Sequence, residues 1–170
     1  MAQFEGLIRR VVQALREADL DYMFTGALAA SYYGLPRTTT DVDIVVRVTE
    51  DNIPTLTRHI KKAGLKGSSR KIQRAIQSGY KIVNIQDKET PLTVDVILST
   101  QELNREKGTI LGLPTWYQTP EALILSKLRR IQATRPKERS VKDKQDIRAI
   151  LRYTEVDMDN LKKQAKKITP

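Results

Sequence analysis

The sequence lacks cysteine and has only one histidine and one tryptophan. Without cysteine, disulfides and thiolate metal sites are excluded. The single histidine, His59, falls in an expected surface helix, where a solvated side chain is favoured over a catalytic one. Residues 1–10 carry paired arginines but no apolar segment followed by a cleavage site. No stretch approaches the roughly 20 apolar residues of a transmembrane helix, so we expect a cytoplasmic protein without membrane contact.

Positive charge is what the chain has in excess. Its 30 Lys and Arg residues outnumber its 20 Asp and Glu residues, which gives a formal net charge of +10. Such an excess attracts polyanions, nucleic acids and nucleotides among them. Many basic proteins bind neither, so the charge alone leaves the partner open. The 170 residues suit one domain, or a compact domain with a helical extension.

The first two-thirds of the chain alternates helical and extended patterns. Apolar residues at helical spacing predict a first helix, and runs rich in Val and Ile predict central strands. The segment 67–79 is polar and basic and is open between helix and loop. Residues 101–107 predict a short helix, and a brief strand follows around Ile110. The remaining expected helices are 4–19, 27–33 and 49–63, and the expected strands are 21–25, 41–48, 81–86 and 92–98.

From residue 119 onward the pattern is helical, with helices expected at 120–134, 138–153 and 157–168. The change near Pro120 is the one plausible domain boundary. We therefore predict an α/β (α+β) fold in which residues 1–118 form a mixed β-sheet core flanked by helices. Residues 119–170 would form an all-helical C-terminal extension packed on that core.

Two carboxylates lie within the predicted strand 41–48. Side chains alternate along a strand, so Asp41 and Asp43 share one face while Val42 and Ile44 pack on the other. Two such carboxylates can share a hard divalent cation, and magnesium leaves its other positions to water and phosphate oxygens. Asp95 lies in a second strand of similar type. If the two strands are neighbours, all three carboxylates converge.

A lone Asp-X-Asp is weak evidence, because surface strands and calcium loops often contain it. Convergence would change that, since two like charges ~4 Å apart repel by about 4 kcal/mol at an effective dielectric of roughly 20. Such a cluster needs a cation or nearby Lys and Arg side chains. Conditional on convergence, we predict a metal site for Mg²⁺ or Mn²⁺ at Asp41, Asp43 and Asp95.

These motifs, taken in order, resemble the Gly-Gly/Ser, Asp-X-Asp and later Asp pattern of nucleotidyltransferases of the DNA polymerase beta superfamily. Gly26-Ala27 is followed after thirteen residues by Asp41-Val42-Asp43, and later by Asp95. Residues 33–40 are similar to the Gly-X-X-Arg-X-Thr run of many small bacterial and archaeal members. Residues 125–128 and 142–147 resemble the abortive-infection toxin-type branch. The resemblance spans about residues 20–152.

The resemblance implies transfer of a nucleoside monophosphate from a nucleoside triphosphate, such as ATP, to an acceptor. In the family, backbone N–H groups of the glycine turn hold the nucleotide phosphates, so Gly26 and Ala27 are expected to bind nucleotide. Ala27 replaces the commoner Ser or Gly and offers no hydroxyl. By resemblance, Asp41 and Asp43 hold the magnesium of the triphosphate, and Asp95 completes a second site and activates the attacking group. Arg37 would either contact phosphates or neutralise the carboxylates.

Lys127 interrupts an apolar stripe on a predicted helix, and Asp146 lies on a similar stripe of the next helix. Ionisable groups on a buried face are costly unless they are paired or functional. One interpretation is a Lys127–Asp146 ion pair that joins the two helices. The other, which the toxin-type resemblance supports, has Lys127 reaching the nucleotide phosphates and Asp146 orienting it. Both can hold together.

The leading acceptor is an RNA end, particularly that of transfer RNA, and a toxin-type enzyme would also have a cognate antitoxin protein as partner. Protein adenylylation and nucleotidylation of a small molecule such as an antibiotic are the alternatives. The rival from another class is a catalytically silent nucleic-acid- or partner-binding module with the same fold. Trp116 and Tyr117 could stack on a base, but core packing is favoured. Basic residues that could grip RNA gather around one predicted helical hairpin: Arg129, Arg130, Arg135, Lys137, Arg139 and Lys142.

Overall fold

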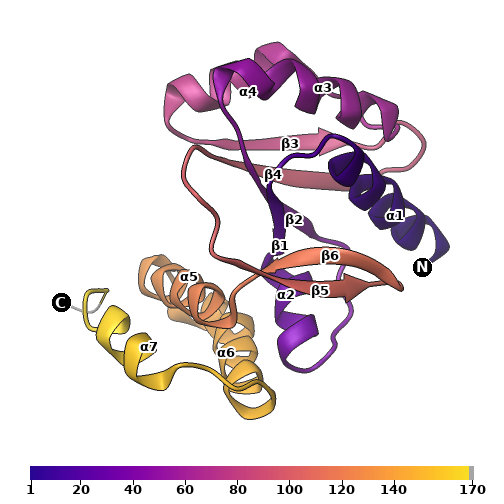
Figure 1. Ribbon diagram of the computed structural model, residues 1–170. Coiled ribbons are helices and arrows are strands. Elements are labelled where there is room, and N and C mark those ends of the chain that lie inside the picture. Colours follow the sequence, from indigo (N-terminus) through magenta and orange to yellow (C-terminus); the bar gives the residue numbers. More distant parts are fainter. Residues whose placement is uncertain (169–170) are drawn as a thin grey trace.

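The computed structural model describes residues 1–168, and its centre is one six-stranded β-sheet (Figure 1). Across the sheet the strand order is β3-β4-β2-β1-β6-β5. The β2–β4 and β1–β6 pairs are parallel and the other three pairs are antiparallel, so the sheet is mixed, as predicted. The strands are β1 (Tyr22–Thr25), β2 (Val42–Arg47), β3 (Ile82–Gln86), β4 (Thr93–Ser99), β5 (Arg105–Ile110) and β6 (Leu113–Gln118).

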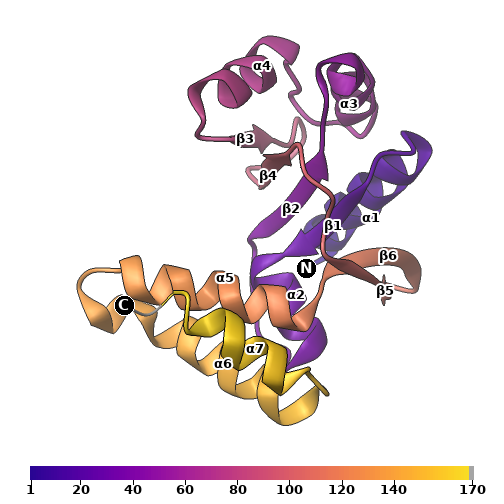
Figure 2. The same ribbon diagram turned by 60° about the vertical axis from the view of Figure 1, so that its left-hand side comes forward.

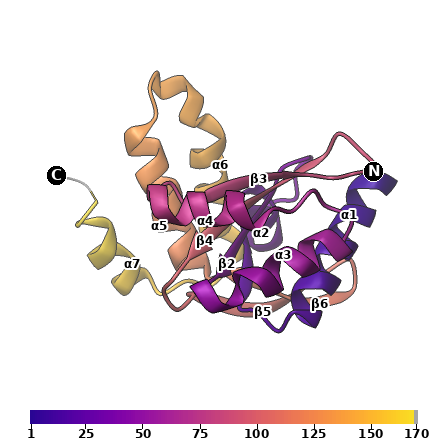
Figure 3. The same cartoon turned by 90° about the horizontal axis from the view of Figure 1, so that it is seen from above.

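Three helices from the first half of the chain pack on the sheet. They are α1 (Ala2–Glu17), α3 (Ile53–Lys62), which follows the 3-10 turn η1 (Glu50–Asn52), and α4 (Ser69–Ser78). Figure 3 shows α3 and α4 side by side over one edge of the sheet. Ile44 of β2 and Val94 and Val96 of β4 are buried against α1 and α3. Because side chains alternate along a strand, Asp43 and Asp95 are turned to the opposite face.

The C-terminal helices form a group at the end of the molecule remote from α3 and α4 (Figures 1 and 2). They are α5 (Pro120–Ala133), α6 (Val141–Tyr153), preceded by the 3-10 turn η2 (Lys137–Ser140), and α7 (Met158–Ala165). Helix α2 (Gly26–Tyr33) follows β1 directly and contacts both α5 and α6. The approach is close, since a Cβ at Gly34 would lie 2.9 Å from the Ala149 side chain of α6. Helix α2 therefore joins the sheet to the helical group.

The predicted fold class is confirmed, and the open segment 67–79 contains helix α4, whose N-cap Ser68 accepts a hydrogen bond from the Lys71 N–H. The short helix predicted at 101–107 is wrong, because that stretch enters strand β5 instead. Strand β6 was not predicted. Glu and Lys favour a helix in isolation, but pairing with β6 from Arg105↔Gln118 to Ile110↔Leu113 overrides that local preference.

Within residues 1–168, no helix is long and apolar enough to cross a membrane. The predicted boundary between residues 118 and 119 falls between β6 and α5. Division into a core and an extension stays a prediction, and residues 169–170 of that extension lie outside the described part of the chain.

Candidate functional site

A row of polar side chains crosses the centre of the sheet. In the strand register Thr25 lies opposite Asp43, Asp43 opposite Asp95, and Asp95 opposite Asn84. Residues directly opposite one another point to the same face. The Asn84 side-chain amide donates a hydrogen bond of 2.7 Å to Asp95 Oδ1, and the Thr25 hydroxyl donates one of 2.6 Å to Gln118 Oε1. The two strands that carry Asp43 and Asp95 are therefore neighbours, as the metal-site prediction required.

Gly26 sets how closely helix α2 approaches this row. Its φ is +64°, in the left-handed region that glycine adopts without strain. A Cβ at this position would collide with Asp43 Oδ2 and lie 3.1 Å from Asp43 Cγ. Only glycine therefore lets the first turn of α2 touch the Asp43 carboxylate. The following residue, Ala27, is buried and contributes no polar side-chain atom.

The charges around Asp43 oppose its ionisation. Burial raises the pKa of Asp43, and the neighbouring carboxylates of Asp95 and Asp41 raise it further. The positive charges of Arg130 and Lys127 act in the opposite direction. Asp41 lies just before β2, exposed, with its N–H donating to Thr39 Oγ1 at 3.0 Å. The repulsion expected of converging carboxylates is thus present at Asp43.

The donor chemistry of this row fits a hard divalent cation. Within residues 1–168, no three His, Cys, Asp or Glu side chains are gathered into one metal-binding group. Magnesium, however, needs only one or two carboxylates and takes its other ligands from water and phosphate. Asp43 and Asp95 supply two carboxylates on one face, and Asp41 adds charge close enough to act on Asp43. Metal binding at these three residues stays a prediction.

Lys127 is buried between helices α5 and α6, with its side chain 2% exposed. Its Nζ lies 3.0 Å from Asp146 Oδ2 and 3.2 Å from Asp143 Oδ1. The predicted Lys127–Asp146 ion pair is therefore present, and Asp143, which lies on the same predicted helix stripe as Asp146, is a second partner that was not predicted. Arg130, one turn further along α5, lies 3.6 Å from the same Asp143 oxygen.

Arg37 contacts Asp146 instead of the carboxylate row. Its guanidinium donates to both Asp146 oxygens, at 3.1 and 3.2 Å. Burial opposes ionisation of Asp146, but the hydrogen bonds from Arg37 and Lys127 prevail and lower its pKa. The segment before β2 is thus connected to helices α5 and α6 by one charged network, formed by Arg37, Asp146 and Lys127. A direct contact of Arg37 or Lys127 with nucleotide stays a prediction.

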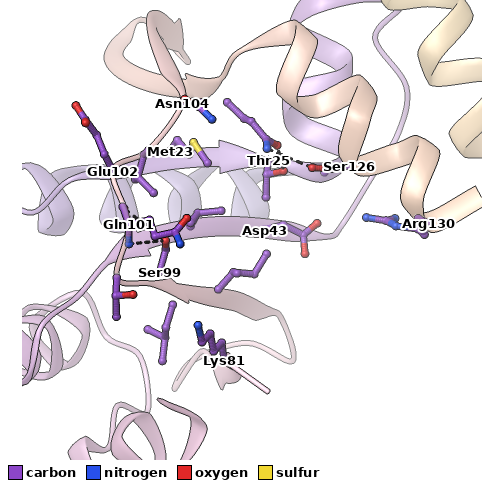
Figure 4. Close-up of a pocket in the computed structure, with 17 residues that line it drawn as sticks. Met23, Thr25, Asp43, Lys81, Ser99, Gln101, Glu102, Asn104, Ser126 and Arg130 are labelled. Atoms are coloured by element: carbon purple, nitrogen blue, oxygen red, sulfur yellow. Dashed lines mark hydrogen bonds between the residues drawn. The ribbon is translucent and has the colours of Figure 1, made fainter. Parts of the chain in front are cut away.

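An open cleft of about 500 Å³ lies against the Asp43 face of the sheet (Figure 4). Asp43 and Gly26 line it beside the apolar side chains of Met23, Val45 and Ile97. The 99–104 segment forms one boundary, and helix α5 contributes another. Four charged side chains line it, two of each sign: Asp43, Glu102, Lys81 and Arg130.

Several of these residues were not identified from the sequence as site residues. Asn84 lies opposite Asp95 because the β3–β4 hairpin pairs Gln86 with Thr93, whereas the 87–91 turn expected from the sequence would have set it opposite Val94. Gln118 and Ser126, which are joined by a 3.3 Å hydrogen bond, carry no pattern that marks them. Lys81 is the first residue of the expected strand 81–86 and carries no signal of a site either.

Most of the other candidate residues lie outside the cleft. His59 lies in α3, with Nδ1 2.8 Å from the Thr55 carbonyl oxygen, and is not among the cleft-lining residues. Tyr117 is a core residue, and Trp116 packs under the Arg105 guanidinium at 3.9 Å. The six basic residues around the α5–α6 hairpin are exposed, and Arg130 is the one that lines the cleft beside Asp43.

The chain resembles known proteins in its three-dimensional structure, but the comparisons based on sequence find no match. No protein-family model matches the chain. A search of curated proteins finds no match either.

Three solved structures share the fold over almost the whole chain. ANT(2")-Ia in complex with adenylyl-2"-tobramycin has a TM-score of 0.71 at 13% identity, covering 99% of this chain and 97% of its own. An antigenic nucleotidyltransferase-like protein from Paracoccidioides brasiliensis has a TM-score of 0.62 at 15% identity, covering 99% and 88%. JHP933 from Helicobacter pylori has a TM-score of 0.57 at 20% identity, covering 98% and 72%. At these identities the likeness establishes a nucleotidyltransferase fold for this chain.

Proposed function

We propose that this chain is a magnesium-dependent nucleotidyltransferase. The observation that supports this most directly is the register of Asp43 with Asp95 on an open sheet face, with the Gly26 turn against the Asp43 carboxylate. Structural scaffolding alone gives no reason to oppose two carboxylates in the centre of a sheet, where like charges destabilise strand pairing. A metal–triphosphate complex would neutralise them. The shared fold supports the same reaction class.

In this proposal Asp41, Asp43 and Asp95 hold the metal, and the backbone N–H groups at Gly26 and Ala27 hold phosphate oxygens. Bound Mg²⁺ or Mn²⁺ would supply charge stabilisation for the attacking and leaving oxygens. Asp95 takes the proton of the acceptor hydroxyl as that oxygen bonds to the α-phosphorus. The bond from the α-phosphorus to the bridging oxygen breaks, and pyrophosphate leaves.

Helices α5 and α6 would serve the triphosphate side of the cleft. Arg130 lines the cleft, and its charge acts on Asp43 together with that of Lys127. We propose that Lys127 directs positive charge at the phosphates, and that Asp146, held by Arg37, fixes its position. Residues 119–170 would then be an extension that completes the active site of the 1–118 core.

The acceptor we propose is an RNA end, with transfer RNA as the leading example. The net charge of +10 and the exposed basic residues of the α5–α6 hairpin favour a polyanion. A toxin-type role and a cognate antitoxin rest on the sequence resemblance alone. A small-molecule acceptor is the second candidate, because ANT(2")-Ia is seen with adenylyl-2"-tobramycin.

Incubation with Mg²⁺ and each α-labelled nucleoside triphosphate in a cell extract tests the reaction class and the acceptor together. We expect label in RNA from the unmodified chain and none from Asp43→Ala. The matched control Asp51→Ala removes an exposed carboxylate in η1 and should keep full activity. Equal labelling by Asp43→Ala would overturn the metal-site assignment. Label in protein or in small molecules would move the acceptor and keep the reaction class, and no label anywhere would favour a silent binding module.

A further inference from the structure

Lys81 has a backbone conformation that its residue type disfavours. Its φ is +59°, in the left-handed region where a Cβ crowds the following carbonyl oxygen. The conformation is held from both sides, because the Lys81 N–H donates to the Ala75 carbonyl at 3.0 Å and its own carbonyl accepts from the Leu98 N–H at 2.7 Å. The strand pairing of β3 with β4 thus begins on a strained residue. Glycine or asparagine would adopt this conformation more easily.

Two other non-glycine residues of the described chain have positive φ, and both lie away from the cleft. Asp19 lies in the turn between α1 and β1, and Leu111 precedes Gly112 in the β5–β6 turn. Lys81 alone of the three lines the cleft beside Asp43. Non-glycine residues in strained conformations gather at ligand-binding sites, where the side chain is needed.

The Lys81 side chain is exposed, and no ion pair to it is found within residues 1–168. Figure 4 shows Lys81 and Arg130 on different sides of Asp43. Arg130 belongs to α5, which contacts α2, the helix whose first turn touches Asp43. A triphosphate held by the α2 turn therefore occupies the Arg130 side. Lys81 is left facing the second substrate.

The surface between Asp95 and Lys81 suits a ring. Met23, Val45 and Ile97 form the next cleft-facing row of the sheet: Val45 and Ile97 lie two residues after Asp43 and Asp95, and Met23 lies two residues before Thr25 on the antiparallel strand β1. The Lys81 carbonyl bonds to Leu98, three residues beyond Asp95, or about 10 Å along an extended strand. A hydroxyl at Asp95, an apolar ring surface and a cation at the far end match the parts of one nucleotide unit.

We propose that Lys81 binds a phosphate of the acceptor and that the acceptor is therefore a nucleic-acid end. This inference rests on the proposed nucleotidyl transfer, whose triphosphate site it leaves to other residues. It assigns to the β3–β4 side of the cleft a role in choosing an anionic acceptor over an uncharged or cationic one.

Replacing Lys81 by glycine separates this role from a structural one. Glycine relieves the backbone strain while it removes the cation, so the melting temperature should stay unchanged or rise. Affinity for Mg²⁺-ATP should be unchanged. Affinity for a short single-stranded RNA should fall, with the log–log salt slope smaller by about 0.7, the value for one phosphate contact. Lys81→Arg should restore RNA binding. Asp19→Gly, which relieves strain outside the cleft, should leave RNA binding as it is.

An RNA affinity and salt slope that Lys81→Gly leaves unchanged would overturn the proposal. So would a loss of Mg²⁺-ATP affinity in that variant, which would place Lys81 in the triphosphate site. Tight tobramycin binding by the unmodified chain without RNA binding would likewise reject an anionic acceptor. If the unmodified chain binds RNA through Lys81 but transfers no nucleotide, the proposed function fails and the phosphate site stands.

Discussion

Replacing Lys127 by methionine tests what the buried charges between α5 and α6 contribute. Removing one partner of a buried ion pair costs about 3–5 kcal/mol, because the other partner is left uncompensated. Here Asp146 keeps Arg37 at 3.1 Å, while Asp143 keeps only the largely exposed Arg130 at 3.6 Å. We therefore expect a loss at the lower end of that range, about 3 kcal/mol in the free energy of unfolding, arising mainly at Asp143.

Denaturant unfolding at pH 7 measures this loss, and a second substitution locates it. Adding Asp143→Asn to Lys127→Met removes the uncompensated charge and should recover most of the stability, giving a clear coupling energy in the double-mutant cycle. Lys144→Met, which removes an exposed lysine of α6, should change stability by less than about 0.5 kcal/mol. A loss below about 1 kcal/mol for Lys127→Met, or no recovery in the double variant, would refute the reasoning.

The same variants decide whether Lys127 also acts on nucleotide. The double variant is expected to be well folded yet to bind Mg²⁺-ATP weakly, since one of the two positive charges that act on Asp43 is missing and only Arg130 remains. Unaltered Mg²⁺-ATP affinity in the double variant would leave Lys127 a purely structural residue. Equilibrium binding at a fixed, saturating Mg²⁺ concentration makes the comparison.

Three further outcomes are expected. Asp43→Asn should abolish transfer, but in chelator at pH 7 it should melt at a higher temperature than the unmodified chain. The native pKa of Asp43 is raised, so ionisation of Asp43 destabilises the fold as pH rises through about 4 and above. The difference in melting temperature should therefore vanish near pH 3, and a difference that persists there would contradict this prediction. Gly26→Ala should lose transfer and about 1–2 kcal/mol of stability, since it adds a left-handed alanine and a clash with Asp43; normal activity would show that the turn is not needed. Asp87→Asn should lose about 1–3 kcal/mol at pH 7, because Asp87 accepts two hydrogen bonds from Arg10 at 2.9 and 3.1 Å. Those bonds lower the pKa of Asp87, so its contribution is present above pH 4 and should disappear as pH falls below that value; a melting difference that is constant with pH would contradict this.

The central strands and their carboxylates could be predicted because local sequence determines them. Apolar and polar residues alternate around Asp43 and Asp95, and this alternation indicates, from the sequence of one strand alone, which side chains are buried. The register between the two strands could not be predicted in this way, because no local sequence feature sets Asp43 opposite Asp95 rather than one residue away. A shift of one residue would have turned one of the carboxylates into the core.

The errors lie where pairing with a distant segment decided the structure. Residues 105–107 are polar because β5 is an edge strand, and charged residues protect such edges from unwanted pairing. Their composition is therefore similar to that of an exposed helix. The pairing of Asp143 with Lys127 and the strained backbone of Lys81 were missed for a related reason. The first depends on the crossing of α5 and α6, and the second is a backbone angle that composition does not reveal.

The parallel pairing of β2 with β4 has a kinetic consequence. Helices α3 and α4 and strand β3 lie between the two strands in the chain, and contacts between distant segments form slowly because the loop must close before they are gained. Forming this strand pair also brings Asp95 opposite Asp43, so one of the slow contacts of the sheet centre is a repulsive one. We therefore expect refolding to accelerate with added Mg²⁺ or on screening by salt, and a refolding rate that neither changes would contradict this. The site would then act as a barrier during folding and be relieved by the ion that the finished site is proposed to use.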